Sequence, residues 1–548
     1  MKIAIGFSWA AGSGVNTSWM LLWELLSKKW YTVLGDKEYA SIIKGDNNDF
    51  FLYISDKDPA KDGAGYFITQ KIDHFFAFDD YSITKNETIY KLKKKYNVSK
   101  QNTKYKNVFC FGAALKLLWI AIEEGKAWLE KSFQGEVLMV NIECLTQGYA
   151  YIKESVENLS ANVGPEKAFM FGNEVLAQGA MESGMDFYAA YPMTPASSLI
   201  DVITPDKRVT FFQWEDEIAV SMTMLGAKFA GKRAMCGTSG WGFALMTESI
   251  SFSNQAELGG VYVLAQRDGP STGTPTFTGQ GDLNYALNAS FGDTFPIVVA
   301  PSTYQDGYAM IWKSLNRSDQ YQHPVIVMSD KQYSEWYLSV DKNTLKAEPI
   351  NRGKLLHQGD ANYQRYQITE DGVSPVMLPW TENGEFIATS YEHKESGAIT
   401  EEPHEKKAMM DKRFRKLDTF VKQEFNENFY GYDIINPEAK IFFVTWGFNR
   451  YVLEDYIKTK NGKCETGNEK YWLIVIKVFQ PFDMRLKTFL EEHAKQIKKM
   501  IFVEMNFSGQ MQELVSNKCL LNDKKRVKKI SNIRKYTLYP IFLEEIKA

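Results

Sequence analysis

Residues 173–267 decide the fold, because helices and strands alternate along this stretch without a break. Four apolar runs are typical of strands: DFYAAY (186–191), RVTFFQ (208–213), RAMCGTS (233–239) and GVYVLAQR (260–267). Helical patterns lie between them, such as NEVLAQGAMESG (173–184) and DEIAVSMTMLGAKFAG (216–231). Strands joined by such helices pair in parallel, because a parallel pair needs a crossover connection. The stretch therefore predicts an α/β domain with a parallel sheet.

The carboxyl ends of these predicted strands carry the unusual residue clusters of the chain. The clusters are YPMTP (191–195), QWEDE (213–217), TSGWG (238–242) and QRDGPSTG (266–273). In an open parallel sheet, ligands bind in the crevice outside the carboxyl ends of the strands. We therefore expect all four clusters to meet in one crevice.

The same alternation extends over much of the chain of 548 residues, a length typical of about three to four domains. We expect a multidomain α/β protein built from three-layer domains with parallel sheets. The predicted parts are an α/β block (1–148), a polar linker (149–167), the central α/β block (168–332), a connecting arm (333–435) and a third α/β block (436–548). Within the first block, GEVLMVNIE (135–143) predicts a strand.

Charge and cysteine usage exclude several classes of protein. The formal net charge is −3, from 64 basic and 67 acidic side chains, which excludes a nucleic-acid clamp and a polybasic membrane anchor. The five cysteines stand apart, as is usual in a reduced compartment. MKIAIGF (1–7) predicts a strand rather than a secretion signal. We expect a cytoplasmic protein that binds neither nucleic acid nor a membrane, and that holds no metal or iron–sulfur cluster itself.

Glu217 is a candidate for proton chemistry in the predicted crevice. It follows QWED at a helix start, where acids commonly do no more than stabilise the helix dipole, by about 0.3–1 kcal/mol each. The helix has a predicted buried stripe of Ile218, Met222, Leu225 and Phe229. This stripe would place Glu217 beside a buried edge, where burial raises the pKa of a carboxyl group.

Thr194 and Arg267 are candidates for binding an anion. Thr194 lies in a turn after a strand, where a Thr-Pro pair usually just begins a helix. Arg267 ends a strand, where an arginine forms either a surface ion pair or a fork for a carboxylate or phosphate. No Ser–His–Asp, Cys–His or metal constellation can be assembled from the sequence. Chemistry in the crevice must therefore be carried by a cofactor.

Together these motifs resemble the α subunit of the 2-oxoacid:ferredoxin oxidoreductases, of the type with a γ domain fused ahead of it. The segments that carry the resemblance are 172–198, 213–231, 238–248, 266–283, 371–375, 391–397, 412–416 and 503–510, with 12–15 and 38–48 for the γ domain. The resemblance implies a γ-type domain, a pyrimidine-binding-type domain for thiamine diphosphate and a C-terminal domain like that of transketolase.

The resemblance also implies an oxidoreductase that decarboxylates a 2-oxoacid to an acyl-coenzyme A and CO₂, with 2-oxoglutarate or pyruvate as the expected substrate. Thiamine diphosphate would be shared with a separate β subunit. That subunit would also hold Mg²⁺, because this chain has no GDG motif followed by a paired NN, and a [4Fe–4S] cluster, because this chain has no set of cysteines for one. Coenzyme A would be the co-substrate, and ferredoxin or flavodoxin would accept electrons from an α2β2-type complex.

Roles for individual residues follow from the same resemblance. Glu217 would hydrogen-bond the aminopyrimidine ring of the cofactor and act in catalysis. Ser239 and Gly240 would contact the cofactor. Thr194 and Arg267 would hold the carboxylate of the substrate.

Three departures from the family pattern affect these expectations. Trp241 stands where the family usually has proline, Gly279 where glutamate is more frequent, and Phe291 where histidine is frequent. They put the identity of the substrate in doubt more than the fold. Two alternatives stay open: a non-catalytic structural or assembly paralogue, and a thiamine enzyme with another electron acceptor.

Overall fold

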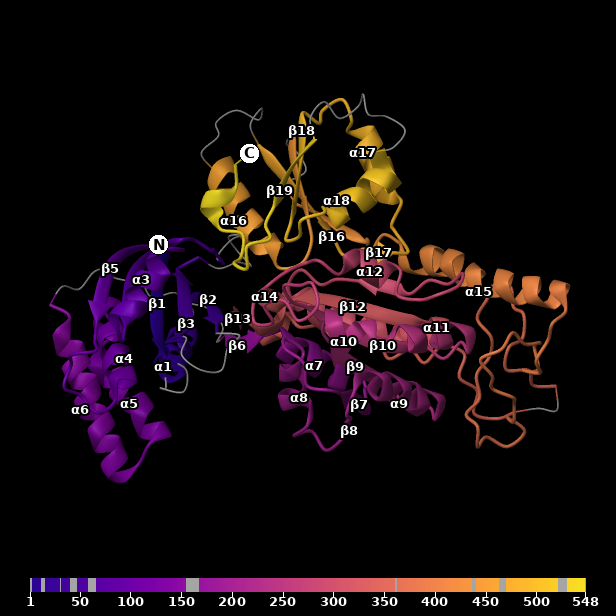
Figure 1. Ribbon diagram of the computed structural model, residues 1–548, viewed down its shortest axis with the longest axis horizontal. Coiled ribbons are helices and arrows are strands. Elements are labelled where there is room, and N and C mark those ends of the chain that lie inside the picture. The colour runs from indigo at the N-terminus through magenta and orange to yellow at the C-terminus, as the bar shows by residue number, and fades with distance from the viewer. Residues whose placement is uncertain are drawn as a thin grey trace.

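The computed structural model describes residues 2–10, 15–29, 31–39, 47–57, 66–153, 167–359, 362–435, 440–462, 470–520 and 530–547. Three sheets lie along an elongated molecule, with the first at one end, the central sheet in the middle and the third above the central one (Figure 1). Residues 12–14, most of 38–48, most of the predicted linker and Cys464 lie outside the described residues.

The first sheet has seven strands and is mixed rather than wholly parallel. In spatial order the strands are β5 (Lys91–Asn97), β4 (Lys71–Ala77), β1 (Lys2–Ala10), β3 (Asn47–Ser55), β2 (Thr32–Glu38), β13 (Tyr337–Val340) and β6 (Ala168–Phe171). β1 pairs in parallel with β4 but antiparallel with β3. The accompanying helices are α1 (Val15–Lys28), α3 (Asp80–Glu87), α4 (Lys106–Leu117), α5 (Ile122–Ser132) and α6 (Gly135–Tyr151).

The strand predicted at 135–143 is wrong, because this segment begins helix α6. The buried residues of α6 are Asn141, Cys144, Leu145 and Gly148, which share one face at helical spacing. That face packs against α4. A Cβ at Gly148 would lie within 3.0 Å of backbone atoms of Phe109, so the glycine allows the two helices to approach closely.

Two strands of the first sheet come from segments predicted to lie elsewhere. β6 begins the predicted central block, and β13 lies at the start of the predicted connecting arm. β13 pairs antiparallel with both β2 and β6, so it joins the first sheet to the rest of the chain. The arm also contains a long helix, α15 (Pro403–Glu424), and a strand of the third sheet, β14 (Tyr432–Ile435). These elements escaped the sequence analysis because the strands are short and the helix is mostly polar.

The central sheet is parallel except for one edge strand. In spatial order its strands are β17 (Val478–Gln480), β11 (Ile297–Val299), β12 (Pro324–Asp330), β10 (Gly260–Gln266), β9 (Ala234–Thr238), β7 (Phe187–Ala190) and β8 (Thr210–Gln213). Among the described strands of this sheet, β17 runs antiparallel to its neighbour and the other pairs are parallel. The helices are α7 (Gly172–Glu182), α8 (Ser197–Ile203), α9 (Glu217–Phe229), α10 (Gly240–Ala244), α11 (Thr247–Gln255), α12 (Leu283–Leu287), α13 (Tyr304–Tyr321) and α14 (Lys331–Glu335).

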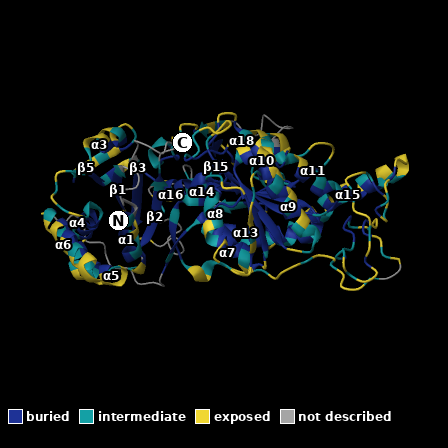
Figure 2. Ribbon diagram, turned by 60° about the horizontal axis from the view of Figure 1, so that its bottom comes forward, coloured by how far each residue is buried: buried dark blue, intermediate teal, exposed yellow. Residues whose placement is uncertain are grey.

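This sheet is covered by helices on both faces, as the three-layer prediction requires. Along β10, Val263 belongs to one core cluster, together with Ile311 of α13. The next residue, Leu264, belongs to a second cluster together with Val220 of α9. Side chains of successive strand residues point to opposite faces, so both faces of the sheet are buried. Most strands of this sheet are accordingly dark blue in Figure 2, although the edge strand β8 is largely exposed, as are the outer surfaces of α5 and α6.

The third sheet carries the C-terminal part of the chain. Its strands, in spatial order, are β14, β16 (Tyr471–Ile476), β15 (Ile441–Thr445), β18 (Lys499–Glu504) and β19 (Ile530–Arg534). Its helices are α16 (Asn449–Asn461), α17 (Arg485–Glu492) and α18 (Gln510–Val515), and short helical turns cover 342–344, 516–520 and 543–545. The predicted multidomain α/β fold is confirmed. No helix within the described ranges combines the length and apolar character needed to cross a bilayer.

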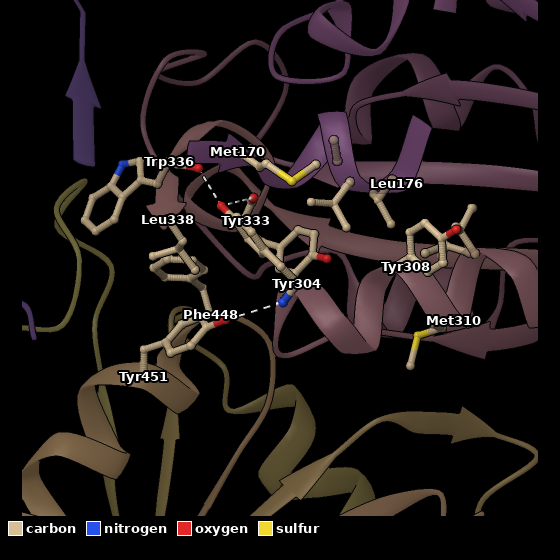
Figure 3. Packing of buried hydrophobic residues seen from close by; sticks show 14 of the residues in the cluster. Met170, Leu176, Tyr304, Tyr308, Met310, Tyr333, Trp336, Leu338, Phe448 and Tyr451 are labelled. Atoms are coloured by element: carbon tan, nitrogen blue, oxygen red, sulfur yellow. Dashed lines mark hydrogen bonds between the residues drawn. The ribbon is translucent and has the colours of Figure 1, made fainter. Parts of the chain in front are cut away.

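A buried aromatic cluster ties the three sheets together (Figure 3). Tyr304 of α13 lies at its centre and donates its hydroxyl hydrogen bond to the carbonyl oxygen of Trp336. The backbone N–H of Tyr304 lies 3.4 Å from the hydroxyl of Tyr451, which belongs to the third part of the chain. Met170 and Leu338 bring β6 and β13 of the first sheet into the same cluster. The three parts therefore share one core.

Candidate functional site

The acids of QWEDE divide their roles at the start of α9. Glu215 is exposed, whereas Asp216 caps the helix and its carboxylate accepts a 2.8 Å hydrogen bond from the N–H of Ala219. Glu217 is the acid that turns inward, and it is only 4% exposed. Asp216 therefore caps the helix, and Glu217, in its first turn, is the acid whose carboxyl group is buried.

The Glu217 carboxyl group lies against the β9–α10 turn. Its Oε1 is buried and has no hydrogen-bond partner among the described residues. A Cβ at Gly242 would lie 2.3 Å from both this oxygen and Thr238 Oγ1, so only glycine fits beside the carboxyl group. Burial raises the Glu217 pKa, the neighbouring charge of Asp216 adds to the effect, and a backbone hydrogen bond opposes it. The raised pKa agrees with the sequence prediction.

The predicted buried stripe of α9 is wrong in part. Ile218 is 50% exposed and Met222 is 44% exposed. The helix instead buries Val220 and Met224, which face the central sheet. Apolar residues occupy two faces of this helix, so the pattern alone could not select the buried one. Glu217 lies at the border between the buried face and the exposed one.

The exposed face of α9 lines a groove of about 1060 Å³. Ile218 and Met222 form one wall, Leu245, Phe291 and Phe414 contribute further apolar surface, and Glu248, Lys406 and Arg413 add charged groups to the lining. An exposed apolar surface of this kind is typical of a protein interface rather than of a free surface.

Arg267 and Thr194 meet at the carboxyl ends of β10 and β7. The Nη1 group of Arg267 donates a 2.9 Å hydrogen bond to the carbonyl oxygen of Thr194. Arg267 is 9% exposed, and its Nε is buried without a partner in the part of the chain that the structure describes. Burial lowers the Arg267 pKa, and the charge of Asp282 opposes this effect. Arg267 is therefore a buried guanidinium with unused donor capacity, not a surface ion pair.

Asp282 belongs to the same site, although the sequence analysis did not assign it. Its backbone N–H donates a 3.1 Å hydrogen bond to the side chain of Gln266 at the end of β10. A Cβ at Gly240 would lie 2.6 Å from its Oδ2, so the carboxyl group lies directly against that glycine. Burial raises the Asp282 pKa to about 6, and Arg267 opposes the rise. The only sequence signal was an acid next to a glycine-rich segment, GQGDL (279–283).

Ser239 and Gly240 lie between the two carboxyl groups of the site. Ser239 precedes α10, and its hydroxyl is buried without a hydrogen-bond partner among the residues described here. Gly240 lies against Asp282, and Gly242 lies against Glu217. Glycine at both positions keeps the turn close to the two acids. All the residues singled out from the sequence therefore lie around the ends of neighbouring strands.

The three departures from the family pattern occupy different places. Trp241 is 53% exposed and Phe291 is 70% exposed, so neither fills the interior of this chain. Phe291 lines the apolar groove beside α9. Gly279 is tightly placed, because a Cβ there would lie 3.2 Å from the carbonyl oxygen of Arg267.

Comparisons with known proteins decide the family. The family model described as pyruvate flavodoxin/ferredoxin oxidoreductase, thiamine diP-bdg, matches residues 178–412. The chain is 29% identical to the 2-oxoacid:ferredoxin oxidoreductase subunit alpha of Saccharolobus solfataricus, over 94% of this chain and 93% of that protein. It is 31% identical to the 2-oxoglutarate synthase subunit KorA of Methanocaldococcus jannaschii, over 64% of this chain and 91% of that protein.

The chain belongs to the α subunits of the 2-oxoacid:ferredoxin oxidoreductases. A solved structure agrees with this: the 2-oxoglutarate:ferredoxin oxidoreductase from Magnetococcus marinus, with 2-oxoglutarate, coenzyme A and succinyl-CoA bound, matches with a TM-score of 0.85 and 26% identity. The match covers 99% of this chain and 98% of that one. The resemblance inferred from the motifs is confirmed, and this α subunit is part of an oxidoreductase.

Proposed function

We propose that this α subunit, together with a β-type subunit, catalyses the thiamine diphosphate-dependent oxidative decarboxylation of a 2-oxoacid to an acyl-coenzyme A. The observation that carries the proposal is the Glu217 carboxyl group, which is buried, has a raised pKa and keeps one oxygen without a partner among the described residues. A group of this kind in a crevice is suited to proton chemistry.

The residues around Glu217 fit the ring end of thiamine diphosphate. Glu217 Oε1 and Ser239 Oγ are two buried polar atoms that lack partners in the described structure, and the glycines at 240 and 242 let the β9–α10 turn lie directly against Asp282 and Glu217. Glu217, Ser239 and Gly240 would hold the aminopyrimidine. When bound, thiamine diphosphate supplies a carbon nucleophile and an electron sink. Glu217 would hold or accept a proton at Oε1, which its raised pKa favours.

Arg267 and Thr194 would bind the carboxylate of the oxoacid. The buried guanidinium has an unused Nε donor, and charge-assisted hydrogen bonds from arginine suit a planar carboxylate. The M. marinus enzyme, whose structure contains 2-oxoglutarate and coenzyme A, supports a 2-oxoacid as substrate and coenzyme A as co-substrate. 2-Oxoglutarate is therefore the first substrate to test, and pyruvate the second.

The apolar groove beside Glu217 would receive the β-type subunit. Ile218 follows Glu217 directly, so a partner seated on the exposed face of α9 would cover the open side of the cofactor site. That partner would bind Mg²⁺, the diphosphate and a [4Fe–4S] cluster, and would pass electrons to ferredoxin or flavodoxin. We expect the two kinds of subunit to form an α2β2-type assembly in the cytoplasm. The buried state of Cys110, Cys144, Cys236 and Cys519 as free thiols fits a reduced compartment.

Turnover of the reconstituted complex tests the proposal. The wild type and Glu217→Ala would be compared with 2-oxoglutarate, pyruvate, branched-chain and aryl 2-oxoacids, with coenzyme A and a dye acceptor. We expect wild-type turnover with one of these classes and a loss of about 100-fold or more in the variant. Equal rates would remove the catalytic role of Glu217 and favour a structural subunit. If the complex turns over with the dye but with neither ferredoxin nor flavodoxin, another electron acceptor is favoured.

A further inference from the structure

A cavity of about 50 Å³ lies where the connecting arm (333–435) meets the central domain. Lys228 at the end of α9 and Asp319 near the end of α13 line it, together with Glu257 just after α11. The arm contributes Arg352 and Arg365. The cavity shares none of its lining residues with the apolar groove beside α9. One water molecule needs at least about 10–15 Å³, so this cavity is large enough for a small ion.

Three cations surround the carboxylate of Asp319. Arg233 Nη1 lies 2.7 Å from its Oδ2, and Arg352 Nε lies 2.8 Å from the same oxygen. The ammonium group of Lys228 pairs with the other oxygen, Oδ1. The Asp319 side chain is buried, as are those of Lys228 and Arg233. One buried carboxylate therefore faces three positive charges, and it can neutralise only one of them.

Glu257, the other acid of the cavity, is outnumbered in the same way. Lys412 and Lys416 lie 2.7 Å and 2.6 Å from its two carboxylate oxygens. Arg365 donates a 2.7 Å hydrogen bond to the backbone carbonyl oxygen of Glu257 and a 3.1 Å hydrogen bond to the side-chain oxygen of Gln322. The guanidinium of Arg365 is therefore buried against two neutral acceptors, while two lysines already neutralise the carboxylate beside it.

The charges around the cavity do not balance. Among the described residues, six cations belong to the two clusters and only two acids do. Asp186 pairs with the exposed Lys232, and the C-terminal dipole of α9 adds only about half a negative charge. Burial lowers the Lys228 pKa well below its usual value, and the charges of Arg352 and Arg233 lower it further. An excess of buried positive charge is costly unless an anion compensates it.

We propose that the cavity binds a small inorganic anion between Lys228, Arg352 and Arg365. The Lys228 ammonium group has three hydrogens and a single acceptor among the described residues, Asp319. Arg352 directs Nε toward Asp319 and donates from Nη2 to the Gly231 carbonyl oxygen, 2.8 Å away, so Nη1 stays available in the described structure. The anion would join the arm to the ends of α9 and α13 and stabilise the chain. This proposal does not depend on the proposed function, because it involves no residue of the crevice.

The test measures the melting temperature of the full chain against anion concentration. In a gluconate buffer of constant ionic strength, inorganic phosphate or chloride should raise the melting temperature and then saturate, by about 2 °C at a hundredfold excess over the Kd. Calorimetric titration should give one site per chain. Arg352→Met should abolish both signals. The matched control is Lys232→Met, which removes an exposed cation beside Asp186 that does not line the cavity, and it should keep both.

Lys228→Met separates anion binding from a merely structural role. It removes a buried charge that Arg233 and Arg352 repel, while Asp319 keeps both arginines as partners. Without phosphate or chloride its melting temperature should therefore not fall below that of the wild type, and neither anion should raise it. A wild type that responds to neither anion would overturn the proposal. A rise that does not saturate and is equal in Arg352→Met would also overturn it, because the anion would then act only through the solvent.

Discussion

Gly242→Ala tests the cofactor site by adding a single methyl group. The new Cβ would lie 2.3 Å from Glu217 Oε1 and 2.7 Å from Glu217 Cδ, whereas ordinary contact begins at 3.4 Å. The carboxyl group must therefore retreat by about 1 Å, and a displacement of that size costs about 100-fold in rate. The new methyl group cannot move away from Glu217 instead, because Thr238 Oγ1 is buried and also lies 2.3 Å from it. We expect kcat/KM to fall by about 100-fold.

The matched control for this prediction is Gly226→Ala on helix α9. A Cβ at Gly226 meets nothing within 4 Å, and alanine within a helix is more stable than glycine by about 0.5–1 kcal/mol. Oxoacid turnover with a dye acceptor would be measured for both variants, together with the melting temperature of each free α subunit. Equal turnover in the two variants would refute the assignment of Glu217. Full additivity of Gly242→Ala with Glu217→Ala would refute it as well, because the methyl group is expected to act only through Glu217.

Three further predictions test the neighbouring features. Burial raises the Asp282 pKa to about 6, so Asp282 becomes charged as the pH rises through 6. The charged group then repels the oxoacid carboxylate near Arg267 and raises the KM. Asp282→Asn should flatten the dependence of KM on pH, and an unchanged dependence would exclude Asp282 as its source. Met222→Glu should prevent co-elution with the β-type subunit in gel filtration. Because Met222 is 44% exposed, the variant should not lower the melting temperature of the free chain. A complex that still forms normally would place the interface elsewhere. Lys412→Met breaks a fully buried ion pair with Glu257, whose charged atoms lie 2.7 Å apart. It should lower the free energy of unfolding, measured by urea denaturation, by about 3 kcal/mol. A loss below about 1 kcal/mol would show that Lys416 alone is enough to pair with Glu257.

The central sheet, and the strand ends at which the four clusters lie, could be predicted from sequence because their signals are local. Each strand of residues 186–267 is a short apolar run that ends in a distinctive cluster, and the parallel connection rule places those ends on one edge. Helix α9 shows where such reasoning stops. Its start was predicted correctly, but its buried face was not. Apolar residues that face the sheet and apolar residues that face the groove look the same in a sequence.

The features that sequence reasoning missed depend on contacts between distant segments. The Tyr39 hydroxyl, just after β2, donates to the carboxylate of Glu335 beside the β2–β13 pairing, and β13 is a four-residue strand in a region with little periodicity. Asp282 joins the site because Gln266 holds its backbone and Gly240 leaves room for its carboxyl group. The first part of the helix at 135–151 has consecutive apolar residues, a pattern that predicts a strand. The helical spacing is seen in the residues that are buried along α6.

Two buried acids of this chain, Glu257 and Glu217, have different surroundings. Glu257 is fully buried, but Lys412 and Lys416 lie 2.7 Å and 2.6 Å from its carboxylate, so the group fastens α15 to the central domain. Glu217 and Arg267 each keep a buried polar atom without a partner among the described residues. Each such atom costs about 1–3 kcal/mol if nothing ever pairs with it. A ligand that forms hydrogen bonds with Glu217 and Arg267 at the strand ends would offset both costs.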